Sequence, residues 1–326
     1  MLRESDISDF LYSRYSVIFF ALIAIITTNF AMNSGEVIPI LDNKGLGLTT
    51  ANNWIAFGKS SMVFSIILNL AIAGLLIYLN KMYNVLRNPT VIFAGLFLVL
   101  QMPFPDLTGQ VYGGTILCIT ILACAFILFS TYSNPNRQAI FLIFTILSIG
   151  TFFQYAFLFY LPVMIIGCMQ MRILDLKTAI AATMGLVTPP WILLGFGYIT
   201  LDSIAFPEFS SIFAKLSTGE AWQMLVSIGL SVFVCIGAWA ANLVRIISYN
   251  AQTRAYNGFF AMVSLVSVLF MLTDFTNYII YVPLLNCCTA IQLGHLFTIY
   301  QSRRSYLGIV TVVTIYFGLY LWALAV

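Results

Sequence analysis

The chain has 326 residues, of which 61% are hydrophobic and only 8% are charged, and its net charge is +3. A soluble domain carries about 25% charged residues, so this composition cannot cover a water-exposed surface and lipid must surround most of the chain. The small positive charge forms no basic stripe, which argues against nucleic-acid binding. We therefore expect residues 1–326 to form one integral membrane domain, an all-α polytopic bundle of transmembrane helices.

The apolar runs predict about eleven membrane-spanning segments in chain order. A polar amphipathic lead, residues 1–14, precedes them and shows no cleavable signal peptide. Residues 33–60 and 200–220 are polar and are expected to be loops on the outer side. The expected spans cover roughly residues 15–32, 62–79, 89–102, 112–131, 139–148, 152–168, 178–199, 221–244, 258–272, 278–297 and 307–325.

Two of the expected hairpins have distinctive turns. The first, residues 89–131, turns at Pro103 to Asp106, where two prolines break the helix and leave one carboxylate at the tip. The second, residues 138–171, has limbs shorter than the roughly 20 residues that a perpendicular crossing needs. We expect it to bend near Gly150 and Thr151, either as a full crossing of a thin bilayer or as a half-depth hairpin.

The charges predict the orientation of the spans. With the N-terminus inside and eleven crossings, 11 of the 14 Lys and Arg residues fall on the cytoplasmic side. The same arrangement puts 7 of the 11 acidic residues outside. Cytoplasmic loops are enriched in Lys and Arg, so the pattern favours an N-in, C-out topology.

No cofactor or metal site is expected from the cysteines or the single histidine. All six cysteines lie in apolar runs, where they are typical of small buried residues. None of them shows Cys-x-x-Cys spacing or pairs with a histidine at the spacing of metal ligands.

The acids of the outer loops are the candidates for catalysis. Asp106 is fixed between prolines, as suits a pre-positioned base, and Glu36 and Asp42 of the first outer loop are placed to converge with it. The turn from Asp274 to Asn277 is expected to line the same vestibule. The alternative is that each is a solvated acid on an outward turn, which satisfies the topology equally well.

One polar stripe is expected inside the membrane. Thr289, Gln292 and His295 recur at helical spacing in the tenth span. Such a stripe faces either neighbouring helices, through hydrogen bonds, or a water-filled cavity. The spans carry no charged residue at their centres, which disfavours a proton-coupled carrier but leaves a carrier for an uncharged solute open.

Residues 92–200 resemble a family of uncharacterised multi-spanning inner-membrane proteins of Bacteroidetes. The resemblance rests on three short motifs, and the family's basic-acidic-aromatic triplet is replaced here by residues 174–177. It implies a location in a bacterial inner membrane and no particular reaction. The three motifs are Phe104-Pro105-Asp106, Phe152-Phe153-Gln154-Tyr155 and Gly185-Leu186-Val187-Thr188-Pro189-Pro190.

The arrangement of spans and loops also resembles the core of polyprenol-dependent membrane glycosyltransferases. In those enzymes an acid of the first outer loop acts as base or metal ligand, and Glu36 or Asp42 stands at that place here.

Three hypotheses for the function follow from the sequence. The protein is a lipid-handling or cell-envelope component, an enzyme acting on a lipid-linked sugar at the outer face, or a carrier. The expected partners are the bilayer and either a lipid-linked substrate or another membrane protein.

Overall fold

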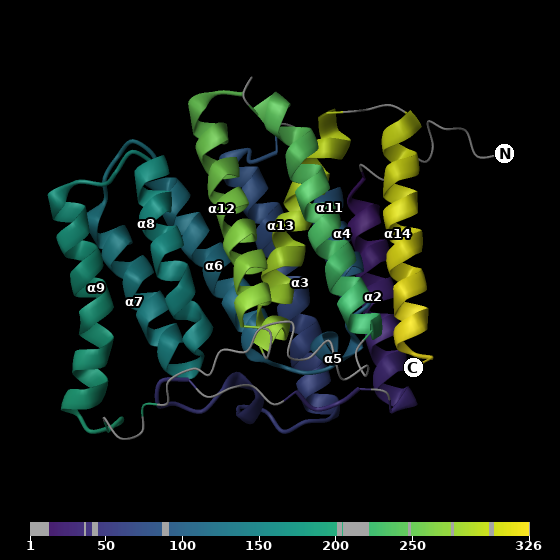
Figure 1. The fold of residues 1–326 in the computed structure, drawn as a ribbon, viewed down its shortest axis with the longest axis horizontal. Coiled ribbons are helices and arrows are strands. Elements are labelled where there is room, and N and C mark those ends of the chain that lie inside the picture. The colour runs from purple at the N-terminus through teal and green to yellow at the C-terminus, as the bar shows by residue number, and fades with distance from the viewer. Residues whose placement is uncertain are drawn as a thin grey trace.

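In the part of the chain that it describes, the computed structural model is mostly helical and contains no strand. Its helices stand side by side with roughly parallel axes, and successive helices run in opposite directions (Figure 1). The described residues are 13–35, 37–40, 45–86, 91–200, 204, 222–246, 249–274, 277–299 and 303–325.

Seven helices within these residues are long and apolar enough to cross a membrane. They are α2 (Arg14–Ser34), α3 (Lys59–Tyr83), α6 (Gly113–Ser130), α9 (Leu176–Gly195), α11 (Trp222–Ile246), α12 (Ala251–Thr273) and α13 (Tyr278–Ile299). The other helical elements are η1 (Ala51–Asn53), α4 (Ile92–Gln101), α5 (Pro105–Thr108), α7 (Arg137–Phe153), η2 (Tyr155–Tyr160), α8 (Leu161–Gln170) and α14 (Arg303–Ala323). The all-α architecture is thus confirmed, with seven candidate spans among the described residues, while the count of eleven crossings stays a prediction.

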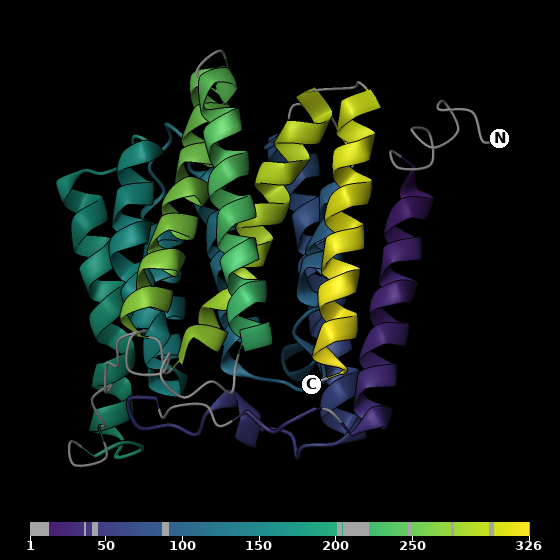
Figure 2. The same cartoon turned by 45° about the vertical axis from the view of Figure 1, so that its right-hand side comes forward.

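The two faces of the bundle are distinguished by their connections. One face, here named the α5 face, carries α5, η1 and the end of α2 at Ser34, at the bottom of Figure 1. The opposite face carries the start of α2 and the connection from α8 to α9. Helix α2 begins on that opposite face and α14 ends on the α5 face, as Figure 2 also shows.

The expected bend of the second hairpin near Gly150 is wrong. Helix α7 continues through Gly150 to Phe153, and the chain leaves the helix only at Gln154, whose backbone is extended. Gly150 instead makes room for a ring, because a Cβ there would lie 2.4 Å from the ring of Phe157. The glycine thus marks a close side-chain contact between the two limbs.

The expected span 258–272 lies within a longer helix, because α12 begins at Ala251. Asn250 caps the helix by accepting the backbone N–H of Thr253 at 2.9 Å. The polar first turn that precedes the expected span is therefore helical.

Helix α13 is the centre of the bundle, surrounded by α4, α6, α11 and α12 (Figures 1 and 2). Glycines let its neighbours approach closely. A Cβ at Gly114 of α6 would lie 2.7 Å from the carbonyl oxygen of Ile280, and one at Gly294 would lie 2.9 Å from the Cβ of Phe93. Small residues at such contacts are typical of helices packed within a membrane.

Helix α9 stands at one end of the bundle and packs on α7 (Figure 1). Its start is a capping box in which Asp175 accepts the backbone N–H of Thr178 at 2.6 Å. Hydrogen bonds from the side chain and backbone of Thr178 lower the pKa of Asp175. The rest of α9 is the least covered of the long helices, with Trp191 77% exposed, as expected where lipid is the neighbour.

Candidate functional site

Asp106 forms a hydrogen bond to the backbone of the connection between α2 and α3, on the α5 face. Its Oδ1 accepts the N–H of Ile38 at 2.7 Å. Gln110 continues the contact, accepting the N–H of Ile40 at 3.1 Å and donating to the carbonyl of Ile38 at 2.8 Å. Burial raises the pKa of Asp106, and the hydrogen bond from Ile38 opposes the rise. The two side chains therefore act on the extended segment 37–40 as a neighbouring strand would.

The other two acids proposed for catalysis, Glu36 and Asp42, lie outside the described residues. The described part of their connection crosses the α5 face to the end of α7 (Figure 2). There Leu46 and Leu48 donate backbone N–H groups to the carbonyls of Thr151 and Phe152 at 3.2 and 3.0 Å. The first connection is thus bound to the bundle at both α5 and α7.

Asp274 lies inside the bundle and does not line an open vestibule. It is fully buried at the end of α12. Its Oδ2 accepts hydroxyl groups from Tyr155 and, at 3.1 Å, from Tyr281, and its Oδ1 accepts the side-chain amide of Asn277 at 2.8 Å. This buried cluster joins η2 to α12 and α13.

The stripe on α13 is buried as well, and its members face different neighbours. Thr289 donates to the carbonyl of Leu285 on its own helix at 2.8 Å. Gln292 accepts the side-chain amide of Asn242 from α11, through its backbone oxygen at 2.7 Å and its Oε1 at 3.2 Å. His295 has its ring 6.2 Å from that of Tyr249. The stripe thus contributes polar contacts between helices.

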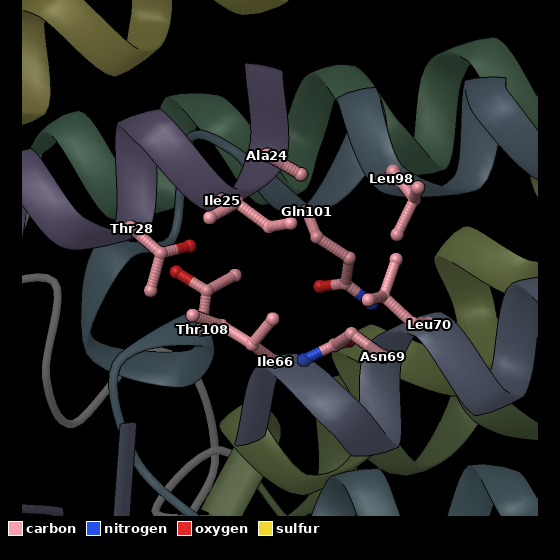
Figure 3. A pocket seen from close by; sticks show the side chains of 9 residues that line it. All are labelled: Ala24, Ile25, Thr28, Ile66, Asn69, Leu70, Leu98, Gln101 and Thr108. Atoms are coloured by element: carbon pink, nitrogen blue, oxygen red, sulfur yellow. The ribbon is translucent and has the colours of Figure 1, made fainter. Parts of the chain in front are cut away.

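The polar groups that surround an open space lie elsewhere, between α2, α3, α4 and α5 (Figure 3). The amide of Gln101 points into this cleft from the end of α4. Gln101 is 3% exposed, and neither its Nε2 nor its Oε1 has a hydrogen-bond partner. The lining consists of Ala24, Ile25, Thr28, Ile66, Asn69, Leu70, Leu98, Gln101 and Thr108, and we name it the Gln101 cleft.

The Gln101 cleft is small and open on one side. Its space for the centre of a water molecule is ≈ 20 Å³, and one buried water needs roughly 10–15 Å³ of such space. Ile25 of α2 and Ile66 of α3, which line the cleft, are both half-buried.

A wholly apolar recess lies on the other side of α2. It measures ≈ 420 Å³ between α2, α4 and α14 and includes Phe20, Val99 and Phe317. The hydroxyl of Tyr320 joins α14 to α2 beside it by donating to the carbonyl of Thr27 at 2.8 Å. Helix α2 therefore separates an apolar recess from a polar cleft.

Among the described residues, no group of three or more His, Cys, Asp or Glu side chains could hold a metal ion. Comparison of the chain with protein-family models, with curated proteins and with solved structures gives no match. The geometry of the site is therefore the basis for any assignment of function.

Gln101 was not among the site residues expected from the sequence. The available signal was that Thr28, Asn69 and Gln101 are polar residues inside apolar runs, each in the half of its span nearer the α5 face. Such residues are uncommon in membrane helices and mark contacts or sites. These three residues come together only because α2 and α3 pack on α4. The sequence of any one span does not predict that packing.

Proposed function

We propose that the protein is a lipid-handling component of the cell envelope, resident in a bacterial inner membrane. The observation that supports this proposal is the Gln101 cleft, where an unpartnered buried amide faces a space between apolar helices. A soluble ligand would have to cross lipid to reach a cleft among membrane helices, whereas a lipid is already there. The apolar recess behind α2 is a matching surface for acyl chains.

The proposal includes the topology. The chain crosses the membrane eleven times, with the N-terminus in the cytoplasm and the α5 face outside. Support comes from the distribution of Lys and Arg, and from the opposite directions of successive helices in Figure 1. The Gln101 cleft then lies in the outer leaflet.

The contacts of Asp106 favour this proposal over a glycosyltransferase-like enzyme. A general base must reach the substrate proton, typically at about 2.6–3.2 Å. One oxygen of Asp106 is already engaged by the N–H of Ile38, and the adjacent Gln110 holds the same segment. These contacts suit a structural role for Asp106. In an Asp106→Asn variant, the side-chain oxygen would still accept the N–H of Ile38.

The experiment is lipid retention during purification. Wild-type protein should retain one lipid per chain in mild detergent, as counted by native mass spectrometry. Ala24→Trp, which fills the Gln101 cleft from α2, should lose that lipid. Leu22→Trp is the matched control, because Leu22 is on the same helix, is 54% exposed and lies outside the cleft. Equal retention by wild type and Ala24→Trp would contradict the proposal.

A further inference from the structure

The Gln101 cleft is specific enough to indicate which part of a lipid it binds. Resting on the proposed function, we propose that it takes an uncharged carbonyl group of a lipid, with Nε2 of Gln101 as the hydrogen-bond donor. An ester carbonyl of a diacylglycerol and the ring carbonyl of a prenylated quinone share this chemistry.

The charge of the lining selects an uncharged group. All nine lining residues are neutral, and the four polar ones are Thr28, Asn69, Gln101 and Thr108. A phosphate, carboxylate or ammonium group in this space would be desolvated with no opposite charge beside it, which is strongly unfavourable. A neutral group lacks that penalty.

The hydrogen-bonding state of the lining indicates an acceptor. Asn69 already donates its amide to the carbonyl of Ser65 at 3.0 Å, and Thr108 donates its hydroxyl to the carbonyl of Pro105 at 3.3 Å. Gln101 alone among these three keeps an amide donor that is buried and unpartnered. Buried polar groups are nearly always paired. Both Nε2 and Oε1 of Gln101 are unpartnered. A carbonyl oxygen of a ligand would satisfy the Nε2 donor, whereas the Oε1 acceptor would need a hydroxyl or a water.

The depth of the cleft agrees with a carbonyl. Asn69 lies ten residues inside α3 from Lys59, about 15 Å at 1.5 Å per residue. The headgroup region of a bilayer is about 5–8 Å thick on each side, so the cleft lies within the hydrocarbon. Ester and quinone carbonyls can lie below the charged headgroups. A phosphate at the same depth would lose its hydration, which is strongly unfavourable for a charged group. The space of ≈ 20 Å³ admits one small group and excludes a sugar.

The test compares two lipids that carry a carbonyl group with one that lacks it. Full-length protein is delipidated in detergent and titrated with a diacylglycerol, with the dialkylglycerol of the same chain lengths, and with a prenylated naphthoquinone, and bound lipid is counted by native mass spectrometry. The diacylglycerol or the quinone should bind about tenfold more tightly than the dialkylglycerol, as expected for one hydrogen bond. The tighter of these two identifies the source of the carbonyl.

Substitutions test whether Gln101 causes the difference in affinity between lipids with and without a carbonyl group. Gln101→Leu should abolish the preference for the carbonyl lipid. Gln154→Leu is the matched control, because Gln154 is also buried with an unpartnered amide but lies at the end of α7, and it should keep the preference. If Gln101→Leu does not fold, the comparison of the two lipids on wild-type protein decides. Equal binding of diacylglycerol, quinone and dialkylglycerol would overturn this inference while leaving lipid handling intact, whereas absence of any bound lipid would overturn both.

Discussion

At the scale of single residues, several polar side chains form hydrogen bonds that hold non-helical segments to the helices. Asp106 and Gln110 bond the backbone of residues 37–40 as a strand would, although no strand is present in the described part of the chain. Asp274 similarly accepts hydrogen bonds from three residues, one in η2 and two at the start of α13. Each of these residues makes a separate prediction about stability.

The Asp106 contact predicts a dependence of stability on pH. Burial raises the pKa of Asp106 above 3.8, so between 3.8 and the raised value the folded protein binds more protons than the unfolded chain. Stability should therefore fall as the pH rises through that window. Asp106→Asn cannot titrate and keeps the acceptor for Ile38, so it should lose this slope and fold normally at pH 7. Thermal unfolding in detergent from pH 3.5 to pH 6 measures the slope, and an unchanged slope in Asp106→Asn would disprove the assignment.

The Asp274 cluster predicts a large loss of stability and a specific coupling. Asp274→Ala removes the acceptor shared by Tyr155, Asn277 and Tyr281 and should cost about 3–5 kcal/mol, because buried donors are left unpaired. Tyr281→Phe alone should cost about 1 kcal/mol. In the Asp274→Ala background, the same change should cost almost nothing. Tyr320→Phe is the uncoupled control, and additive effects of Asp274→Ala and Tyr281→Phe would refute the cluster.

At the scale of elements, the pairing of α9 with α7 depends on one close approach. A Cβ at Gly185 would lie 2.4 Å from the carbonyl oxygen of Phe141, whereas a Cβ at Gly195 of the same helix meets nothing within 4 Å. Gly185→Val should therefore destabilise the protein by about 1–3 kcal/mol, by overpacking. Thermal unfolding in detergent measures this, with Gly195→Val as the control. Equal effects of the two changes would mean that α9 does not rest on α7 in the membrane.

The elements themselves were largely predictable, because a run of apolar residues can be satisfied in lipid only as a helix. The expected segment 62–79 lies within α3, and 278–297 lies within α13. What failed was local. Gly150 was interpreted as a bend although it accommodates the ring of Phe157, and the expected span 258–272 did not include the first turns of α12. Hydrophobicity encodes neither the packing of a ring against Gly150 nor the cap that starts α12.

The site was less predictable than the helices for the same reason. Asp106 was selected because it is charged and held by prolines, yet its partner is the backbone of a segment 68 residues away. Gln101, only five residues earlier, carries the unpartnered amide and has no distinguishing sequence neighbours. Identifying it requires knowing that α2, α3 and α4 enclose one space.

At the scale of the whole molecule, the remaining prediction is the orientation in the membrane. The six native cysteines are buried and free, so a new surface cysteine can be labelled with little background. Trp54 on the α5 face and Leu174 on the opposite face are 46% and 47% exposed, which makes them a matched pair. In spheroplasts, an impermeant maleimide should label Trp54→Cys at once and Leu174→Cys only after the membrane is opened. Leu174 lies between Arg172 and Lys177, and the rule that cytoplasmic connections are rich in Lys and Arg predicts that this connection is cytoplasmic. Labelling of Leu174→Cys in sealed spheroplasts would invert the topology and move the Gln101 cleft to the inner leaflet, where a lipid ligand would have to be supplied from the cytoplasmic side.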